Sequence, residues 1–236
     1  MKRVIIALVL CFTFLTFSQA FAKEKPRLGV LRFTNNTSAA WWSGTAGRDL
    51  QDMLAAELVT LKAFQVLERK ELEAVIGEQD LGASGRIKKS TRSKIGNITG
   101  AKYLVAATVS AFEKGVSGTK GGFGFKGISL GGKKKKAYIA VDLKIIEVET
   151  GEIVEARTVE ATAKSGGLVG GLRLRSFSGN LGKEKKTPTG KAIRACIMEI
   201  AEYLECALVK KDNCMAGYDA KESKRREKTK GSIDLE

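Results

Sequence analysis

The spacing of hydrophobic residues predicts a β-α-β unit near the start of the chain. Residues 27–34 and 64–68 alternate apolar with polar positions, which is typical of strands. Between these segments, apolar residues recur every three or four positions from Arg48 to Leu61 and predict a one-sided helix. The first strand and this helix are separated by a loop of small residues that spans 35–47.

Two shorter helical segments are expected after this unit. Residues 71–81 predict a short helix, and we expect Leu72, Val75 and Ile76 to form its inward face. Residues 93–100 predict one or two further helical turns that end at Gly100.

Three long segments in the second half of the chain predict an antiparallel sheet. Ala101–Phe112 reads as a strand that is buried on both faces over its centre. Ala137–Glu147 alternates cleanly between apolar and polar residues. The sequence Glu-Thr-Gly-Glu then predicts a hairpin turn, because Gly151 permits a positive φ, and Ile153–Ala163 is the expected return strand.

The last predicted helix completes the fold. Thr187 is the expected N-cap, and Pro188 fits the first helical position. Residues 213–236 are highly charged and poor in apolar side chains, so we expect a disordered tail there. The order of elements predicts an α/β domain with a mixed sheet over residues 23–212.

Two glycine-rich inserts interrupt this domain, at residues 115–136 and 165–186. Both are longer than a hairpin connection requires. In the second insert, three leucines fall on one face of an extended strand and two arginines on the other: Leu168, Leu172 and Leu174 against Arg173 and Arg175. This arrangement suits a strand between lipid and a water-filled lumen, whereas two basic surface loops would produce the same pattern.

The N-terminal residues predict export. A charged start and an apolar segment precede Ala20-Phe21-Ala22, which fits signal-peptide cleavage, so residues 1–22 are the expected signal peptide. Leu10 precedes Cys11, whereas lipid attachment requires a small residue at that position. We therefore expect a mature chain that starts at Lys23 without an acyl chain.

The charge and composition narrow the function. The 236 residues carry a formal net charge of +15, which falls to +13 without Lys2 and Arg3. For an exported protein, this charge indicates an anionic envelope surface as partner and not nucleic acid. The chain contains no histidine, the commonest general base and zinc ligand, so we expect neither an enzyme nor a metal site or cofactor.

The cysteines and tryptophans are the remaining candidates for structural or functional roles. After cleavage, three cysteines are left, of which Cys206 and Cys214 flank a helix end and can form a disulfide in an oxidising compartment. Cys196 reads as a small buried residue. Trp41 and Trp42 lie in the loop after the first strand, where they can pack on the domain, form a subunit contact or narrow a passage.

Three stretches carry a resemblance to a known family: FQVLERKEL from Phe64, GAKYLVAATV from Gly100, and IAVDLKIIEVETGEI from Ile139. In these stretches the chain resembles the CsgG family, the outer-membrane secretion channel of the curli amyloid system. The resemblance implies a periplasmic α/β domain that forms a homo-oligomeric ring and acts on an exported polypeptide. Each subunit of such a ring donates two β-hairpins to a shared transmembrane β-barrel.

The same resemblance assigns roles to individual segments. The two hairpins correspond to the two inserts, with Phe123 and Phe125 as strand candidates in the first. The family's pore constriction corresponds to residues 35–45, which makes Asn35, Asn36, Trp41 and Trp42 the constriction candidates. A soluble periplasmic accessory module on the same scaffold is the alternative function.

Overall fold

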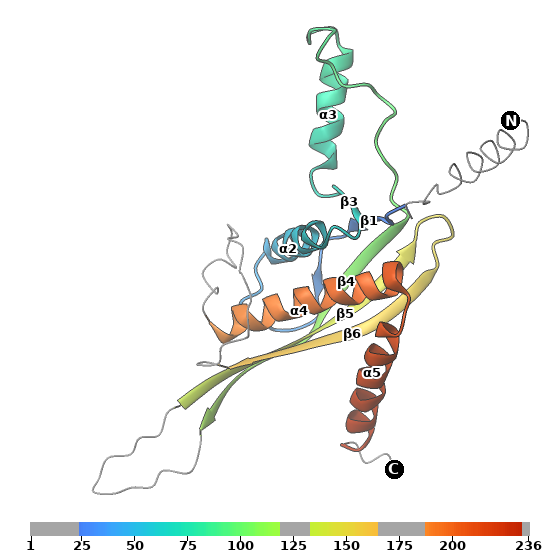
Figure 1. The fold of residues 1–236 in the computed structure, drawn as a ribbon. Helices are drawn as coiled ribbons and strands as arrows, with labels where there is room; N and C mark the ends of the chain where they lie inside the picture. The colour runs from blue at the N-terminus through green and yellow to red at the C-terminus, as the bar shows by residue number, and fades with distance from the viewer. Residues whose placement is uncertain (1–23, 119–132, 165–186, 233–236) are drawn as a thin grey trace, which may run out of the picture.

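A computed structural model describes residues 24–118, 133–164 and 187–232 of the chain (Figure 1). In chain order the elements are β1 (Arg27–Val30), β2 (Thr34–Asn35), α2 (Ala46–Leu61), β3 (Gln65–Leu67), α3 (Leu72–Ala83), β4 (Tyr103–Gly118), β5 (Lys133–Glu147), β6 (Ile153–Lys164), α4 (Pro188–Glu205), the π-helix η2 (Cys206–Lys210) and α5 (Cys214–Lys230). This is the mixed α/β fold that the pattern predicts.

The strands form one mixed sheet in the order β3-β1-β4-β5-β6, with β2 pairing to β4 beyond the end of β1. The β1, β2 and β3 pairings are parallel, whereas β4, β5 and β6 form an antiparallel meander. Gly151 in the β5–β6 turn has a φ of 74°, which glycine adopts without strain. The turn therefore lies where the sequence predicts it.

Helices α2 and α4 contact each other and cover one face of the sheet (Figure 1). Alternate residues of β5, from Ala137 through Ile145, point into this layer and are almost completely buried. On α4, the buried stripe includes Ile193, Ile197 and Ile200. Burial of such side chains contributes about 1.5–3 kcal/mol each, so this helix–sheet interface is the main core.

A close approach fixes the start of α2. A Cβ atom on Gly47 would collide with the carbonyl oxygen of Phe33, and the Phe33 N–H donates to the Gly47 carbonyl at 3.1 Å. Buried Gln51 also donates from Nε2 to the carbonyl of Val30 at 2.7 Å. These bonds hold the loop between β1 and α2 tightly against the sheet.

The opposite face of the sheet is polar. Hydrogen bonds join side chains of neighbouring strands, with Oγ atoms of Thr34 and Thr108 2.7 Å apart and Thr158 donating to Asp142 at 2.8 Å. Leu104 and Ala106 on this face of β4 are half-buried. The prediction that the centre of β4 is buried on both faces is therefore wrong, because the helices cover only one of them.

Two predictions about the segment after β3 are also wrong. Helix α3 forms, but Val75 and Ile76 are 41% and 43% exposed, since α3 projects away from the rest of the domain (Figure 1). Residues 93–100 form a turn at Ile95 and Gly96 and are otherwise irregular, with no helical turn. The apolar spacing of α3 identified a helix but could not show what the helix packs against.

The prediction of a disordered tail after Asn213 is wrong for residues 214–230, which form α5. This helix has no buried residue, so hydrophobic spacing gave no sign of it. Most of its contacts with the domain are polar: Arg157 of β6 donates to the Tyr218 carbonyl and pairs with Asp219 at 2.8 Å, and Lys221 pairs with Glu199 at 2.7 Å. The partly buried Met215 and Tyr218 add apolar contacts with the core. Within the helix, Glu222 pairs with two arginines.

We predict that Arg157→Leu releases α5 without unfolding the sheet. Hydrogen bonds from charged groups contribute about 1.5–3 kcal/mol each, and Arg157 supplies two to α5. Hydrogen exchange should show loss of protection across residues 214–230 while β4 and β5 keep theirs.

Lys221→Ala is the matched control, because its ion pair is 68% exposed on the lysine side and should contribute less than about 1 kcal/mol. Equal protection of α5 in Arg157→Leu and the unsubstituted protein would show that Arg157 does not hold this helix.

Candidate functional site at the insert-bearing end of the sheet

Both inserts are attached at the same end of the sheet. The first connects the last residue of β4 to the first residue of β5, and Gly118 pairs with Lys133 across this junction. The second follows β6, whose last residue, Lys164, pairs with Lys136. Because β4 and β6 run in the same direction on either side of β5, the two inserts leave the domain side by side.

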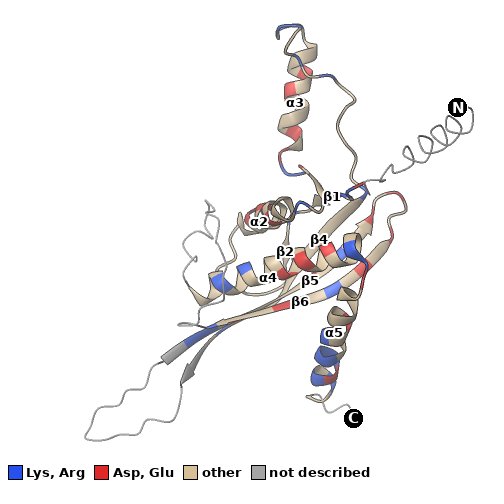
Figure 2. Ribbon diagram, in the orientation of Figure 1, with Lys and Arg blue, Asp and Glu red and all other residues tan. Residues whose placement is uncertain are grey.

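Lysines surround this end of the sheet (Figure 2). Lys114, Lys135, Lys136 and Lys164 are exposed, and they come from three adjacent strands. Like charges on neighbouring strands repel one another, so the fold does not gain stability from gathering them. Their arrangement gives the base of the inserts a strongly cationic surface.

A β-bulge changes which side chains of β4 face the helices. Val109 pairs with Val141 and Ala111 with Ala140, so Ser110 is one extra residue in β4. Before the bulge the odd-numbered residues face α2 and α4; after it, Phe112 pairs with Ile139 on that side. The bulge therefore presents Phe112 to the loop that follows β2.

That loop lies alongside the same part of β4. The Asn36 N–H donates to the Val109 carbonyl at 2.9 Å. The Asn35 side chain bonds the backbone and hydroxyl of Thr37, with its Oδ1 accepting from the Thr37 Oγ at 2.7 Å. Asn35 is thus a turn-forming residue that is half-buried, whereas the side chain of Asn36 is exposed.

The two tryptophans pack on the domain. The rings of Trp41 and Phe112 meet edge to face with centroids 5.7 Å apart, and the rings of Trp41 and Trp42 with centroids 5.5 Å apart. Both indoles are half-buried against the hydrophobic core. The structure thus gives the tryptophans the packing role that the sequence left open, while a role of the loop in lining a passage stays a prediction.

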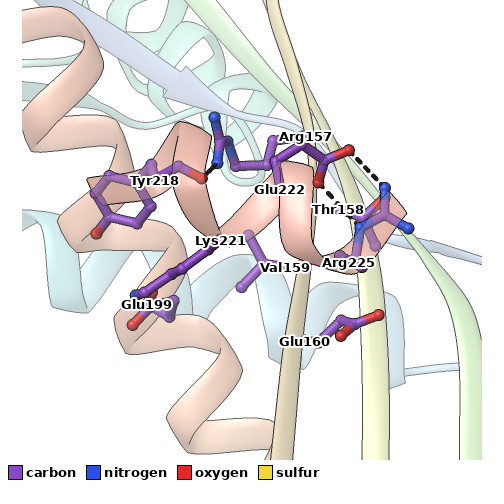
Figure 3. Close-up of a pocket in the computed structure, with 9 residues that line it drawn as sticks. All are labelled: Arg157, Thr158, Val159, Glu160, Glu199, Tyr218, Lys221, Glu222 and Arg225. Carbon is purple, nitrogen blue, oxygen red and sulfur yellow. Dashed lines mark hydrogen bonds and ion pairs between the residues drawn. The ribbon is translucent and has the colours of Figure 1, made fainter. Parts of the chain in front are cut away.

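A groove of about 360 Å³ separates α5 from β6 and α4 (Figure 3). The Arg157 guanidinium lies against the rings of both Tyr203 and Tyr218, 4.9 and 5.5 Å from their centroids, and the two rings meet edge to face with centroids 5.2 Å apart. Burial raises the pKa of Tyr203 to about 12, with a further contribution from its hydrogen bond to Glu155. Arg225 lowers the pKa of Glu222 to about 2 through a side-chain hydrogen bond.

The charges that line this groove balance. Three cations face three carboxylates: Arg157, Lys221 and Arg225 against Glu160, Glu199 and Glu222. Most of these charged groups already pair within the groove, as Figure 3 shows for Arg225 and Glu222. We interpret the groove as the seam that docks α5. Sequence reasoning missed Arg157, although an arginine at a helix-facing position of a strand is a sign of a buried polar partner.

Cys206 and Cys214 form a disulfide that joins the end of α4 to the start of α5, with their Cα atoms 6.0 Å apart. Asp212 lies beside them, but sulfurs that are bonded to each other do not supply the thiolate ligands of a metal site. Cys196 is a free, buried thiol whose pKa is raised by burial. It packs in the core of α4 and β6, where its sulfur faces the Val159 carbonyl.

The remaining candidates lie outside the described residues. These are the expected signal peptide and the insert residues Phe123, Phe125, Leu168, Leu172, Arg173, Leu174 and Arg175. Among the helices that the structure does describe, none is both long and apolar enough to cross a membrane.

Comparison with known proteins shows distant similarities. The chain is 34% identical to a Neisseria meningitidis serogroup B protein whose name describes it as a putative lipoprotein. The aligned 108 residues are 46% of this chain and 43% of that protein. The chain therefore spans less than half the length of this relative. Two solved structures are distantly similar to this chain.

One is a hypothetical protein from Chlamydia trachomatis, with a TM-score of 0.43 and 13% identity over 77% of this chain and 96% of that one. The other is the PelC dodecamer from Paraburkholderia phytofirmans, with a TM-score of 0.38 and 14% identity over 75% and 86%.

A family model gives a much broader match. The model of the curli production assembly/transport component CsgG matches residues 13–233. This range includes every described strand and helix as well as both inserts. The chain therefore belongs to the CsgG family.

Proposed function

We propose that the protein is an outer-membrane-associated, oligomeric channel or assembly component for the export of surface protein of the curli type. The common exit of both inserts from one end of the sheet carries this proposal. The antiparallel order of β4, β5 and β6 directs the inserts to the same side, as a transmembrane structure requires. Family membership supports transport or assembly as the general role and supports a non-enzymatic function.

The physics of hairpins in lipid supports a ring of identical subunits. A single hairpin is only marginally stable, and in lipid its outer strands leave backbone groups without hydrogen-bond partners. Only a closed barrel satisfies these groups, and two hairpins from one chain are too few to close one with a lumen wide enough for a polypeptide. We therefore infer that several copies contribute their inserts to one barrel.

The cationic end of the sheet supports attachment to the envelope. Juxtamembrane lysines contribute about 1 kcal/mol each near an anionic lipid surface. Exposed Lys114, Lys136 and Lys164 lie where the inserts would enter such a surface. The predicted signal peptide and the relative named as a lipoprotein also support an exported, envelope-associated protein.

The same lysines favour one alternative function. A periplasmic accessory module could use its basic inserts to bind lipopolysaccharide or cell wall without entering the bilayer. The two functions differ in whether the leucines of the second insert contact lipid.

We further propose that residues 35–45 contribute to the constriction of the channel. Trp41 anchors this loop on Phe112, and its exposed residues, the candidates to line a passage, are Asn36, Ser38, Ala40, Gly44 and Thr45.

Leu172→Arg tests the membrane role of the second insert. If Leu172 faces lipid near the bilayer midplane, the arginine should cost about 2–4 kcal/mol and deplete assembled rings in membrane extracts. Leu172→Val is the control at the same position and should assemble normally. Equal assembly of both variants would favour the accessory module.

Trp41→Ala tests the anchoring of the loop. Loss of a large aromatic side chain that packs on Phe112 should lower the free energy of unfolding by roughly 3 kcal/mol in a urea titration. Asn36→Ala removes an exposed side chain, so stability should change by less than about 0.5 kcal/mol while single-channel conductance increases. A fully stable Trp41→Ala protein with a larger conductance would instead make the indoles the narrowest point.

A further inference from the structure

A second cavity, of about 390 Å³, lies at the end of the sheet opposite the inserts. Three segments that are distant in sequence meet there: the residues before β1, the start of β4 and the end of η2. The residues that carry the argument are Lys25, Arg27, Lys102, Tyr103, Leu208 and Lys211.

The backbone holds these segments together. The Lys102 N–H donates to the Arg27 carbonyl at 2.9 Å, which fixes the N-terminal segment against β4. Lys211 adopts a left-handed conformation with a φ of 51°, and its N–H donates to the Cys206 carbonyl at 2.9 Å. The Cys206–Cys214 disulfide closes the turn around Lys211. The cavity is therefore defined by the fold and not by loose side chains alone.

The cavity carries an excess of positive charge. Four cations line it against one carboxylate, Glu24, which already pairs with Arg27 at 2.8 Å. Within the part of the chain that the structure describes, Lys25, Lys102 and Lys211 form no ion pair, and the Lys102 ammonium contacts only the Tyr103 ring, 5.3 Å from its centroid. This is the reverse of the α5 groove, where the charges cancel.

We propose that this cavity binds a phosphate-type dianion. Three lysines without acidic partners line the same cavity, and a dianion bound among them would be attracted by each of them. Lysine is a compact point charge that suits phosphate oxygens, and a dianion matches the charge better than a single carboxylate. Buried Leu208 and the Tyr103 ring offer an apolar wall to the group that carries the phosphate.

The shared chemistry, a phosphomonoester dianion, has two sources: a soluble phosphomonoester or a lipid whose headgroup is a phosphomonoester. Strand β4 runs from the cavity to the inserts over 16 residues, or about 50 Å. If the inserts enter a bilayer, the cavity lies far outside it, which favours the soluble source. The site does not depend on the proposed export function, because none of its residues belongs to an insert.

The test uses the full mature chain titrated with inorganic phosphate by calorimetry, and co-sedimentation with phosphatidic acid vesicles, whose headgroup is a phosphomonoester, in a second arm. The double variant Lys102→Gln/Lys211→Gln should raise the Kd for phosphate by roughly tenfold or more, since it removes two of the three lysines without acidic partners. Lys62→Gln/Lys144→Gln removes the same net charge from exposed lysines elsewhere and should change the Kd by less than about twofold.

Each outcome decides the assignment. Saturable phosphate binding that only the cavity variant weakens supports the site and a soluble ligand. Vesicle binding that only the cavity variant weakens supports the site and a lipid headgroup. No saturable binding in either arm, or equal weakening in both double variants, would overturn the proposal; circular dichroism checks that both variants remain folded.

Discussion

The long antiparallel pairing of β4 with β5 is the interaction on which the rest of the structure depends. It extends from Tyr103 and Glu147 to Gly118 and Lys133 without interruption other than the bulge at Ser110. A shift of one residue would turn every buried side chain of β5 to the polar face, so the helix-covered core fixes this register. The register in turn decides where both inserts leave the domain and which side chains meet the loop after β2.

One edge of this sheet, strand β6, is covered by a helix. Strand β6 is the last strand on one side, and an uncovered edge strand invites pairing with other chains. Helix α5 lies beside residues 157–160 of β6, held there by polar contacts and by the disulfide that closes its connection to α4. No residue of α5 is fully buried, and its apolar contribution to the core is limited to the partly buried Met215 and Tyr218.

The sequence predicts the positions of strands and helices, because these depend on the local spacing of apolar residues. It does not predict which faces are buried where contacts between distant segments determine the burial. The alternation of Ile139, Val141 and Leu143 identified β5 and its buried face. Thr187 and Pro188 identified the start of α4, where the Oγ of Thr187 accepts a hydrogen bond from the Gly190 N–H. The same spacing placed Leu72, Val75 and Ile76 of α3 inward, although Val75 and Ile76 are exposed and only Leu72 is half-buried.

The candidate site was less predictable than the fold. The tryptophan loop was recognised, but the packing of Trp41 on Phe112 follows from the bulge at Ser110, which alternation alone does not show. Helix α5 was missed because it contacts the domain through residues distant in sequence, such as Arg157, which lies 61 positions before its partner Tyr218. The cavity of Lys25, Lys102 and Lys211 requires three distant segments to meet, which no pattern in the chain reveals.

The central claim is that the inserts of several copies assemble in a membrane, and native mass measurement of the fractionated protein tests it most directly. Cell envelopes are washed with high salt and then extracted with detergent, and the mass of the protein is determined in each fraction. The account predicts that the protein resists the salt wash and leaves the outer membrane only in detergent, as a single closed oligomer. A monomer released by salt without detergent would contradict it, because a basic module bound to an anionic surface behaves in that way.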